Sequence, residues 1–270
     1  MLIIPFCLQE VTDLNEIIAL NLWQFALIYL LLILVLLIMK KCNINQSKLL
    51  LVASFRMTVQ LTLAGLVLTY IFENPHPLFT VLYLMLMTGF AIFTVLSSNK
   101  DINLRFKVIV GASLAITGLF IVSFFIMAVV GVSLFNPRYT IPISGMIIGN
   151  AMTGVGLGLR VFNENIKTQR SRIDSLLNIG ATPQKILIPF VNRALETALL
   201  PTMYSMIGMG VVSLPGMMTG QILSGTLPMT SIMYQIAVII AICAVTCLSV
   251  FCSLYFGYKT LYNEKLQMNF

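Results

Sequence analysis

Long apolar runs recur along the whole chain, and they constrain its fold more than any other feature. The chain has 270 residues, of which 59% are hydrophobic and only 9% are charged. A water-soluble domain of this size carries roughly 25% charged residues. This deficit excludes an ordinary cytosolic enzyme, a secreted disulfide scaffold and a disordered chain. It predicts an all-α, polytopic membrane helix bundle.

Seven of the apolar runs are long enough to cross a bilayer, which takes about 20 residues for a helix. Breakers or charged segments separate them from one another. The predicted spans cover residues 17–39, 49–72, 78–98, 108–132, 139–161, 195–214 and 230–257. The sequence therefore predicts a single transmembrane domain over residues 1–270, with about seven transmembrane helices.

Basic residues collect on one side of this predicted bundle. With the N-terminus placed outside, the inner segments hold fifteen of the sixteen Lys and Arg residues, and Arg138 alone lies outside. Acidic residues divide four outside and five inside, so they show no such bias. Lys and Arg favour the cytoplasmic side of membrane proteins. The pattern predicts an N-out, C-in topology and explains the net charge of +7 without a nucleic-acid partner.

Two polar residues mark the second predicted span. Arg56 lies near its inner end, and Gln60 lies one helical turn deeper on the same face. They are candidates for the polar lining of a translocation path. The alternative is a snorkelling arginine with a polar helix–helix contact, because Arg side chains near helix ends reach for the interface.

The fifth predicted span is rich in glycine. Gly145/Gly149 and Gly154/Gly158 form two small-xxx-small pairs, which let helices approach closely in lipid. Glycine at this density is also expected to make the helix easy to break. Asn150 and Thr153, which lie between the two pairs, are polar at membrane depth. They are candidates for the path, with helix–helix packing as the alternative.

An uncharged stretch with one proline and three glycines follows the sixth span, at residues 214–225. Either a re-entrant or broken element near the outer mouth, or a plain outer loop, fits this composition. Gln221 lies in it. We therefore expect the substrate path to be lined by Arg56, Gln60, Asn150, Thr153 and Gln221.

Sulfur-containing residues leave the question of a metal site open. Cys243 and Cys247 share a face of the last span, and Met203, Met206 and Met209 form a stripe on another helix. Both sets can ligate soft metals, but packing residues are the expected interpretation. No phosphate-binding loop and no hydrolase or metalloprotease motif occurs in the sequence. We therefore predict no catalytic residues, and an intramembrane enzyme is disfavoured.

The segment over residues 164–193 combines charge with helical apolar spacing. Its polar positions alternate with the apolar set Ile166, Ile173, Leu176, Leu177 and Ile179. Gly180 is typical of a helix C-terminus, and Thr182-Pro183 is typical of a helix start. The pattern predicts an amphipathic helix, a glycine turn and a second helix outside the bilayer. Such a knob suits force transfer from another protein, and an ordinary surface connector is the alternative.

Several motifs in the chain carry a resemblance to known permeases. Asp174-Ser-Leu-x-x-x-Gly180-Ala-Thr182 resembles the coupling-helix motif of ABC transporter permeases, with an acidic residue six positions before a glycine. Four blocks are similar to the FetB family, and the Leu-Pro-Gly-Met-Met-Thr-Gly-Gln block is its distinctive one. These blocks are Gly145–Asn150, Asp174–Pro183, Ser213–Gly225 and Arg56-x-x-x-Gln60-Leu61.

The resemblance implies a multi-pass permease of a bacterial inner membrane, associated with iron or other metal export. It implies a separate cytoplasmic ABC ATPase subunit that hydrolyses ATP, a permease homodimer in the lipid bilayer, and no cofactor bound by this chain. The coupling helix then lies between the fifth and sixth spans. The residues expected to couple to the ATPase are Arg170, Arg172, Asp174, Leu177, Gly180, Ala181, Thr182 and Pro183.

Substrate does not follow from the resemblance, because plant relatives are linked to aluminium tolerance and nucleotide-sugar transport. An ABC permease for a non-metal substrate such as a nucleotide sugar is therefore one alternative. A secondary transporter or channel that works without an ATPase is another. The absence of charged residues other than Arg56 near the predicted span interiors disfavours proton coupling.

Overall fold

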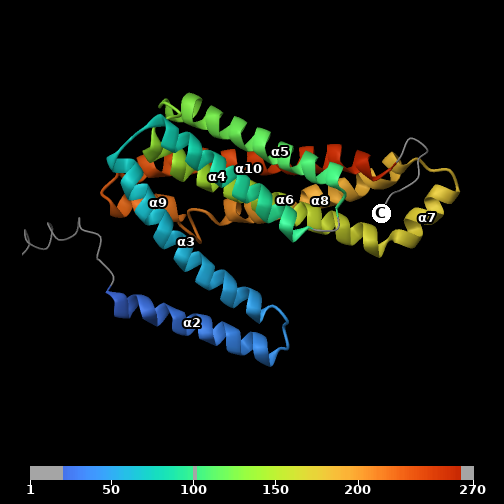
Figure 1. Ribbon diagram of the computed structural model, residues 1–270, viewed down its shortest axis with the longest axis horizontal. Helices are drawn as coiled ribbons and strands as arrows, with labels where there is room; N and C mark the ends of the chain where they lie inside the picture. The colour runs from blue at the N-terminus through green and yellow to red at the C-terminus, as the bar shows by residue number, and fades with distance from the viewer. Residues whose placement is uncertain (1–20, 100–101, 263–270) are drawn as a thin grey trace, which may run out of the picture. The chain divides into compact units, whose positions relative to one another are not determined.

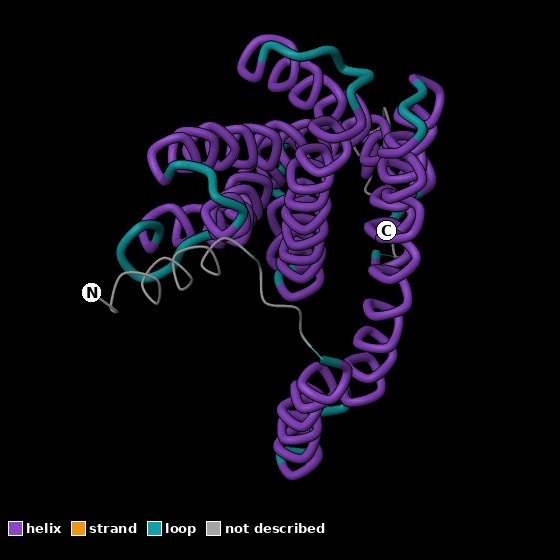
Figure 2. The backbone as a smooth tube through the Cα atoms, turned by 90° about the vertical axis from the view of Figure 1, so that its left-hand side faces the viewer, coloured by secondary structure: helices purple, strands orange, loops and turns teal. Residues whose placement is uncertain are grey.

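The computed structural model describes residues 21–99 and 102–262, and this part of the chain consists of helices and loops without a strand (Figure 2). The all-α prediction is confirmed. A π-helical turn at Phe125–Val130 follows α5, and a short 3-10 turn at Tyr258–Leu261 follows α10. The α-helices are α2 (Leu22–Lys41), α3 (Ser47–Glu73), α4 (Pro77–Ser98), α5 (Leu104–Phe124), α6 (Pro137–Thr168), α7 (Arg170–Asn178), α8 (Pro183–Gly208), α9 (Gly216–Leu223) and α10 (Pro228–Gly257).

Six helices of the described residues are long and apolar enough to cross a membrane, namely α2, α3, α4, α5 with its π-helical turn, α6 and α10. The predicted sixth span, residues 195–214, has wrong bounds. α8 begins at Pro183 and ends at Gly208, and polar and charged residues such as Arg193 and Glu196 lower its hydropathy. The count of seven spans therefore stays a prediction. So does the N-out topology, and Lys100 and Lys265, which support it, lie outside the described residues.

The chain divides into two compact units, which are described separately. The smaller unit contains the α2–α3 hairpin and residues 220–227. α2 is apolar on all sides, as expected for a helix surrounded by lipid. The Tyr29 hydroxyl lies 2.6 Å from Thr58 Oγ1 and joins the two helices of the hairpin. The prediction of a single domain over residues 1–270 is not tested by this division.

The larger unit is a helix bundle built around α10, which packs against α5, α6 and α8 (Figure 1). α4 covers another side of α6. Phe106 of α5, Phe162 of α6 and Tyr258 are fully buried at one end of the bundle. This end carries Arg105 and Lys107 at the start of α5, and we call it the basic end.

The helix α6 is continuous over its whole length, although its glycine content makes a helix easy to break. Its glycines serve close packing. A Cβ atom added at Gly154 would collide with Thr246 of α10, and one at Gly158 would lie 2.9 Å from Val250 Cγ1. Packing against neighbours offsets the low helix propensity of glycine, because close backbone approach is what binds helices in lipid.

Substituting Gly154→Ala tests this packing. We expect it to lower the free energy of unfolding by about 1–3 kcal/mol, because the added methyl group overpacks the contact with Thr246. Gly149→Ala on the same helix is the matched control, since its Cβ would meet no atom within 4 Å. That substitution should be neutral or stabilising by up to about 1 kcal/mol. Thermal unfolding in detergent measures both, and equal stability of the two variants would contradict the packing role of Gly154.

Candidate functional site

A knob formed by α7, a glycine turn and the start of α8 stands at the basic end of the larger unit. α7 ends in a Schellman motif, in which the Ala181 amide donates to the Leu176 carbonyl (3.0 Å) and the Gly180 amide donates to the Leu177 carbonyl (2.9 Å). Gly180 has φ +86°, a left-handed conformation that glycine adopts without strain. The predicted helix–glycine–helix arrangement is thus confirmed.

Two isoleucines of the knob have opposite environments. Ile173 is fully buried and belongs to the core of the bundle, whereas Ile179 is 79% exposed. The sequence placed both on one apolar face, which is wrong for Ile179. α7 ends at Asn178, so Ile179 is the C-cap residue and leaves the helical register. Ile166, which was also assigned to this face, is a buried residue of α6.

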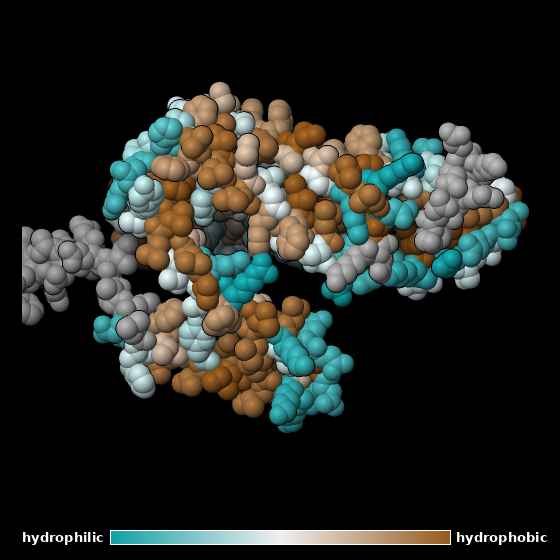
Figure 3. Space-filling model, viewed as in Figure 1, coloured by the Kyte–Doolittle hydropathy of each residue, from teal (hydrophilic) through white to brown (hydrophobic). Residues whose placement is uncertain are grey.

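The eight predicted coupling residues all lie in this knob. Leu177, Ala181 and Pro183 face inward, with Pro183 at the first position of α8. Thr182 is the N-cap residue of α8, as predicted, but its side chain forms no capping hydrogen bond. Thr182 is exposed, and so are Arg170, Arg172, Asp174 and Gly180. Figure 3 shows hydrophilic residues gathered around the end that carries α7, while apolar residues cover the flank of the bundle.

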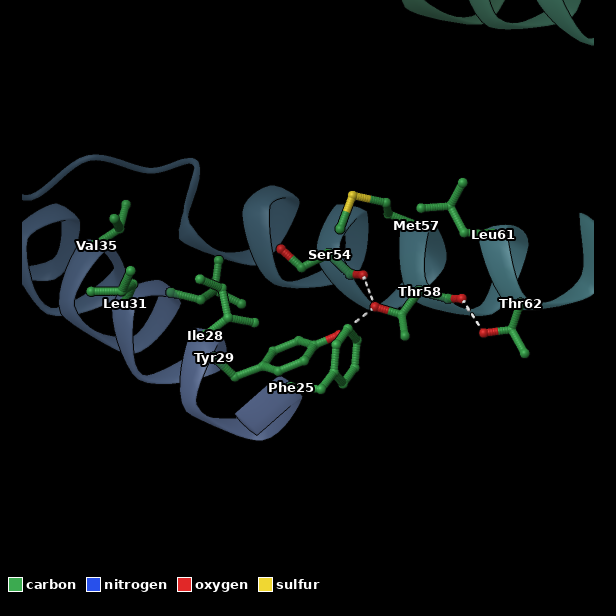
Figure 4. Close-up of a pocket in the computed structure, with 11 residues that line it drawn as sticks. Phe25, Ile28, Tyr29, Leu31, Val35, Ser54, Met57, Thr58, Leu61 and Thr62 are labelled. Carbon is green, nitrogen blue, oxygen red and sulfur yellow. Dashed lines mark hydrogen bonds between the residues drawn. The ribbon is translucent and has the colours of Figure 1, made fainter. Parts of the chain in front are cut away.

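In the smaller unit, α3 carries Arg56 and Gln60 on one face, four residues apart, and both are exposed there. The opposite face of α3 lines an apolar groove of about 640 Å³ shared with α2 (Figure 4). Tyr29 and Thr58 meet inside this groove. The two predicted path residues of α3 therefore do not line the groove of their own hairpin.

In the larger unit, α6 brings Asn150 and Thr153 together on its exposed face. Each donates a hydrogen bond to its own helix, Asn150 to the Met146 carbonyl (2.8 Å) and Thr153 to the Gly149 carbonyl (3.0 Å). Neither side chain is buried in a helix–helix contact within the described chain. Their position is compatible with a path, and their role in transport stays a prediction.

The segment after α8 contains the fifth predicted path residue, Gln221. A Cβ atom added at Gly158 would lie 3.5 Å from Ala198 Cβ of α8 and 2.9 Å from Val250 Cγ1 of α10, so the three residues share one level of the bundle. From this level α8 extends about 15 Å to its end, whereas α10 extends about 33 Å in the same direction, at 1.5 Å per residue. The chain thus turns back after α8 well before the level at which α10 begins. This favours the broken element over the plain outer loop.

The turn itself is built from backbone hydrogen bonds. The Gly208 carbonyl accepts from Val212 (2.9 Å) and Ser213 (3.1 Å), and Gly210 adopts φ +84°. The short helix α9 follows and contains Gln221, whose side-chain oxygen is buried without a partner among the described residues. Irregular backbone at membrane depth survives only when it is buried in protein or lines water.

A second groove, which the sequence did not indicate, lies between α4 and α6 near the basic end. It measures about 520 Å³, and Thr94, Ser98, Asn99, Thr153 and Arg160 line it together with apolar residues. Arg160 Nε donates to Glu164 Oε1 at 2.9 Å. Thr94 and Ser98, four residues apart on α4, are the sequence feature that could have indicated this groove. The helix α6 that completes it is distant in the sequence.

The sulfur-containing candidates form no evident metal site in the described residues. Cys243 and Cys247 are both half-buried on α10, and no group of three or more His, Cys, Asp or Glu side chains gathers among the described residues. The interpretation of Met203, Met206 and Met209 as packing residues stays a prediction.

Comparison with known proteins agrees with the resemblance found in the sequence. The model of the Uncharacterised protein family (UPF0014) matches residues 22–262. The probable iron export permease protein FetB of Escherichia coli is 32% identical over 91% of this chain and 93% of its own length. The UPF0014 membrane protein YjkA of Bacillus subtilis is 34% identical over 77% of this chain and 83% of its own.

A plant protein is similar as well. Protein ALUMINUM SENSITIVE 3 of Arabidopsis thaliana is 33% identical over 79% of this chain and 77% of its own length. No solved structure matches the chain. The six apolar helices and these relatives together identify a multi-pass membrane protein.

Ile173→Ala tests whether the knob is anchored as described. Ile173 is fully buried, so we expect its truncation to lower the free energy of unfolding by about 2–5 kcal/mol. Ile179→Ala is the matched control in the same knob, and its effect should stay within about 0.5 kcal/mol. Thermal unfolding of the two variants in detergent gives the comparison. A larger loss for Ile179→Ala than for Ile173→Ala would refute the assigned orientation of the knob.

Proposed function

The chain belongs to the UPF0014 family, and we propose that it is the membrane permease subunit of an ABC exporter for iron or another metal. The observation that carries the proposal is the similarity to the E. coli iron export permease, which covers nearly the whole of both chains. In this role the chain spans the cell membrane and binds no cofactor. A separate cytoplasmic ABC ATPase subunit hydrolyses the ATP.

The knob supports a contact with such an ATPase. Its inner side is fixed in the bundle by Ile173, and its outer side offers an isolated apolar side chain, Ile179, beside a sharp glycine turn. Arg170, Arg172 and Asp174 are exposed along α7, the helix that ends at this tip. An apolar anchor with a polar rim is the usual composition of a protein–protein contact. The basic end of the bundle then faces the cytoplasm, in agreement with the positive-inside rule.

Transport in this proposal follows from the motion of the knob. Closure of two ATPase subunits on ATP moves the knobs of two permease copies, and the helices change between inward- and outward-facing states. A homodimer is required because an ABC transporter uses two permease units. Arg56, Gln60, Asn150, Thr153 and Gln221 are proposed to line the path, since uncharged or cationic polar groups at membrane depth normally face a cavity or a partner helix.

Metal content of cells tests the substrate. Cells that lack their own exporter and express the chain with its ATPase should accumulate less iron than cells with an empty vector. Manganese, zinc and copper are measured in the same cultures to define specificity. A Gly180→Val variant should restore high iron content, because valine is strained at φ +86° and deforms the knob. Unchanged iron content on expression of the wild-type chain would count against iron as the substrate.

Ile179→Asp tests the contact with the ATPase. We expect at least a tenfold loss of ATPase co-purification and of ATPase stimulation in reconstituted complexes, because a charge replaces the apolar anchor. Stability of the permease should not change, since Ile179 is exposed. The matched control is Ile44→Asp, an exposed isoleucine in the loop between α2 and α3. Normal ATPase stimulation by the Ile179→Asp variant would remove Ile179 from the coupling surface.

A further inference from the structure

The groove between α4 and α6 contains several side-chain hydroxyl groups whose hydrogens are engaged within their own helices. Thr94 Oγ1 donates to the Phe90 carbonyl (2.8 Å), Ser98 Oγ to the Thr94 carbonyl (2.9 Å), and Thr153 Oγ1 to the Gly149 carbonyl (3.0 Å). A hydroxyl group has a single hydrogen. All three hydroxyls therefore offer a ligand only acceptor lone pairs.

Asn99 lies at the end of the same groove, and its amide adds one more acceptor. Its side-chain nitrogen donates to the Val95 carbonyl at 3.0 Å. The amide oxygen remains an acceptor, and the second N–H of the amide remains a donor. The groove thus joins three hydroxyl oxygens and one amide oxygen, which suits a ligand with several N–H donors, such as a primary ammonium group.

Arg160 supplies the opposite chemistry at the same groove. Its Nε is engaged by Glu164, and its two terminal nitrogens are left as donors. A guanidinium group binds phosphate oxygens through two parallel hydrogen bonds. One cationic donor group beside a cluster of neutral acceptors complements a zwitterion that carries both a phosphate and an ammonium group.

The depth of the groove identifies the source of such a zwitterion. α4 ends at Ser98, and the groove extends past this end to Asn99, so it lies where a membrane-spanning helix leaves the bilayer. Val95, Met152 and Leu157 form its apolar part. Polar atoms at the helix end and apolar side chains beside them match the headgroup and the first acyl carbons of a lipid. Basic pockets between transmembrane helices at the cytoplasmic side bind phosphate-containing lipid headgroups.

We propose that the α4–α6 groove is a binding site for a phospholipid with a primary amine in its headgroup, such as phosphatidylethanolamine. Arg160 binds the phosphate, and the ammonium group donates its three N–H bonds to acceptors among the oxygens of Thr94, Ser98, Asn99 and Thr153. The site does not depend on metal transport or on an ATPase, so it stands independently of the proposed function. Thr153 is the one residue that it shares with the proposed substrate path.

Lipid titration of the purified full-length chain, followed by native mass spectrometry, tests the site. Phosphatidylethanolamine is compared with phosphatidylcholine, which lacks N–H donors, and with phosphatidylglycerol, which lacks the amine. We expect phosphatidylethanolamine to bind at least about tenfold more tightly than either, because hydrogen bonds involving a charged group contribute at least this factor. Equal binding of phosphatidylethanolamine and phosphatidylcholine would overturn the proposal.

Variants separate the two halves of the site. Arg160→Gln should weaken binding of all three lipids about tenfold or more. The double variant Thr94→Val/Ser98→Ala should remove the preference for phosphatidylethanolamine and leave binding of the other two unchanged. Arg105→Gln is the control, an exposed arginine at the same end of the bundle that does not line the groove. Circular dichroism and thermal unfolding establish that each variant is folded.

Soluble phosphoethanolamine distinguishes a lipid from a free ligand of the same chemistry. It should compete with the lipid only at concentrations at least a hundredfold higher, because it lacks the acyl chains that would contact Val95, Met152 and Leu157. Competition at equal concentration would assign the groove to a soluble ligand and overturn the lipid site. Wild-type binding of phosphatidylethanolamine by the Arg160→Gln variant would have the same consequence for the role given to Arg160.

Discussion

The close approach of α6 and α10 is the contact on which the packing of the larger unit depends. The hydrophobic effect does not bring helices together in lipid, so dispersion contacts hold them. Small residues allow these contacts because they let the helix backbones approach closely. Gly154 faces Thr246, and Gly158 faces both Val250 and Ala198 of α8. One face of one helix thereby fixes two neighbours. Part of the α6 surface outside these contacts is exposed, and it carries Asn150, Thr153 and Arg160.

The bounds of a span could be predicted where the helix is apolar along its whole length. The predicted runs 78–98 and 230–257 agree closely with α4 at Pro77–Ser98 and α10 at Pro228–Gly257. The helix predicted to start at Thr182-Pro183 and the span predicted over residues 195–214 are one continuous helix in the structure, α8. The backbone of a helix forms its own hydrogen bonds in water and in lipid alike. The helix α8 therefore begins at its N-cap signal, Thr182-Pro183, and continues through the charged residues Arg193 and Glu196.

The knob could be predicted because its signals lie within a few residues of one another. Contacts between distant segments could not be predicted. Gly180 signals the end of α7 and Pro183 the start of α8, and both act within a few residues. The exposure of Ile179 depends on a helix end shifted by one residue, which periodicity does not resolve. The α4–α6 groove joins Thr94 with Arg160, and only the fold brings these positions together. Glycine pairs indicated close packing, but the partner helix was not readable from them.

The continuity of α6 gives the knob a direct mechanical connection to the bundle. α6 runs unbroken from Pro137 to Thr168, and only Gln169 separates it from α7. Ile166 and Ile173 are buried on either side of this junction, so the two helices are packed into one core. A displacement of α7 therefore acts on α6, and through Gly154 and Gly158 on α10 and α8. Packed interiors respond to such a shift by changing between discrete arrangements rather than by bending, which is the property that an alternating-access permease requires.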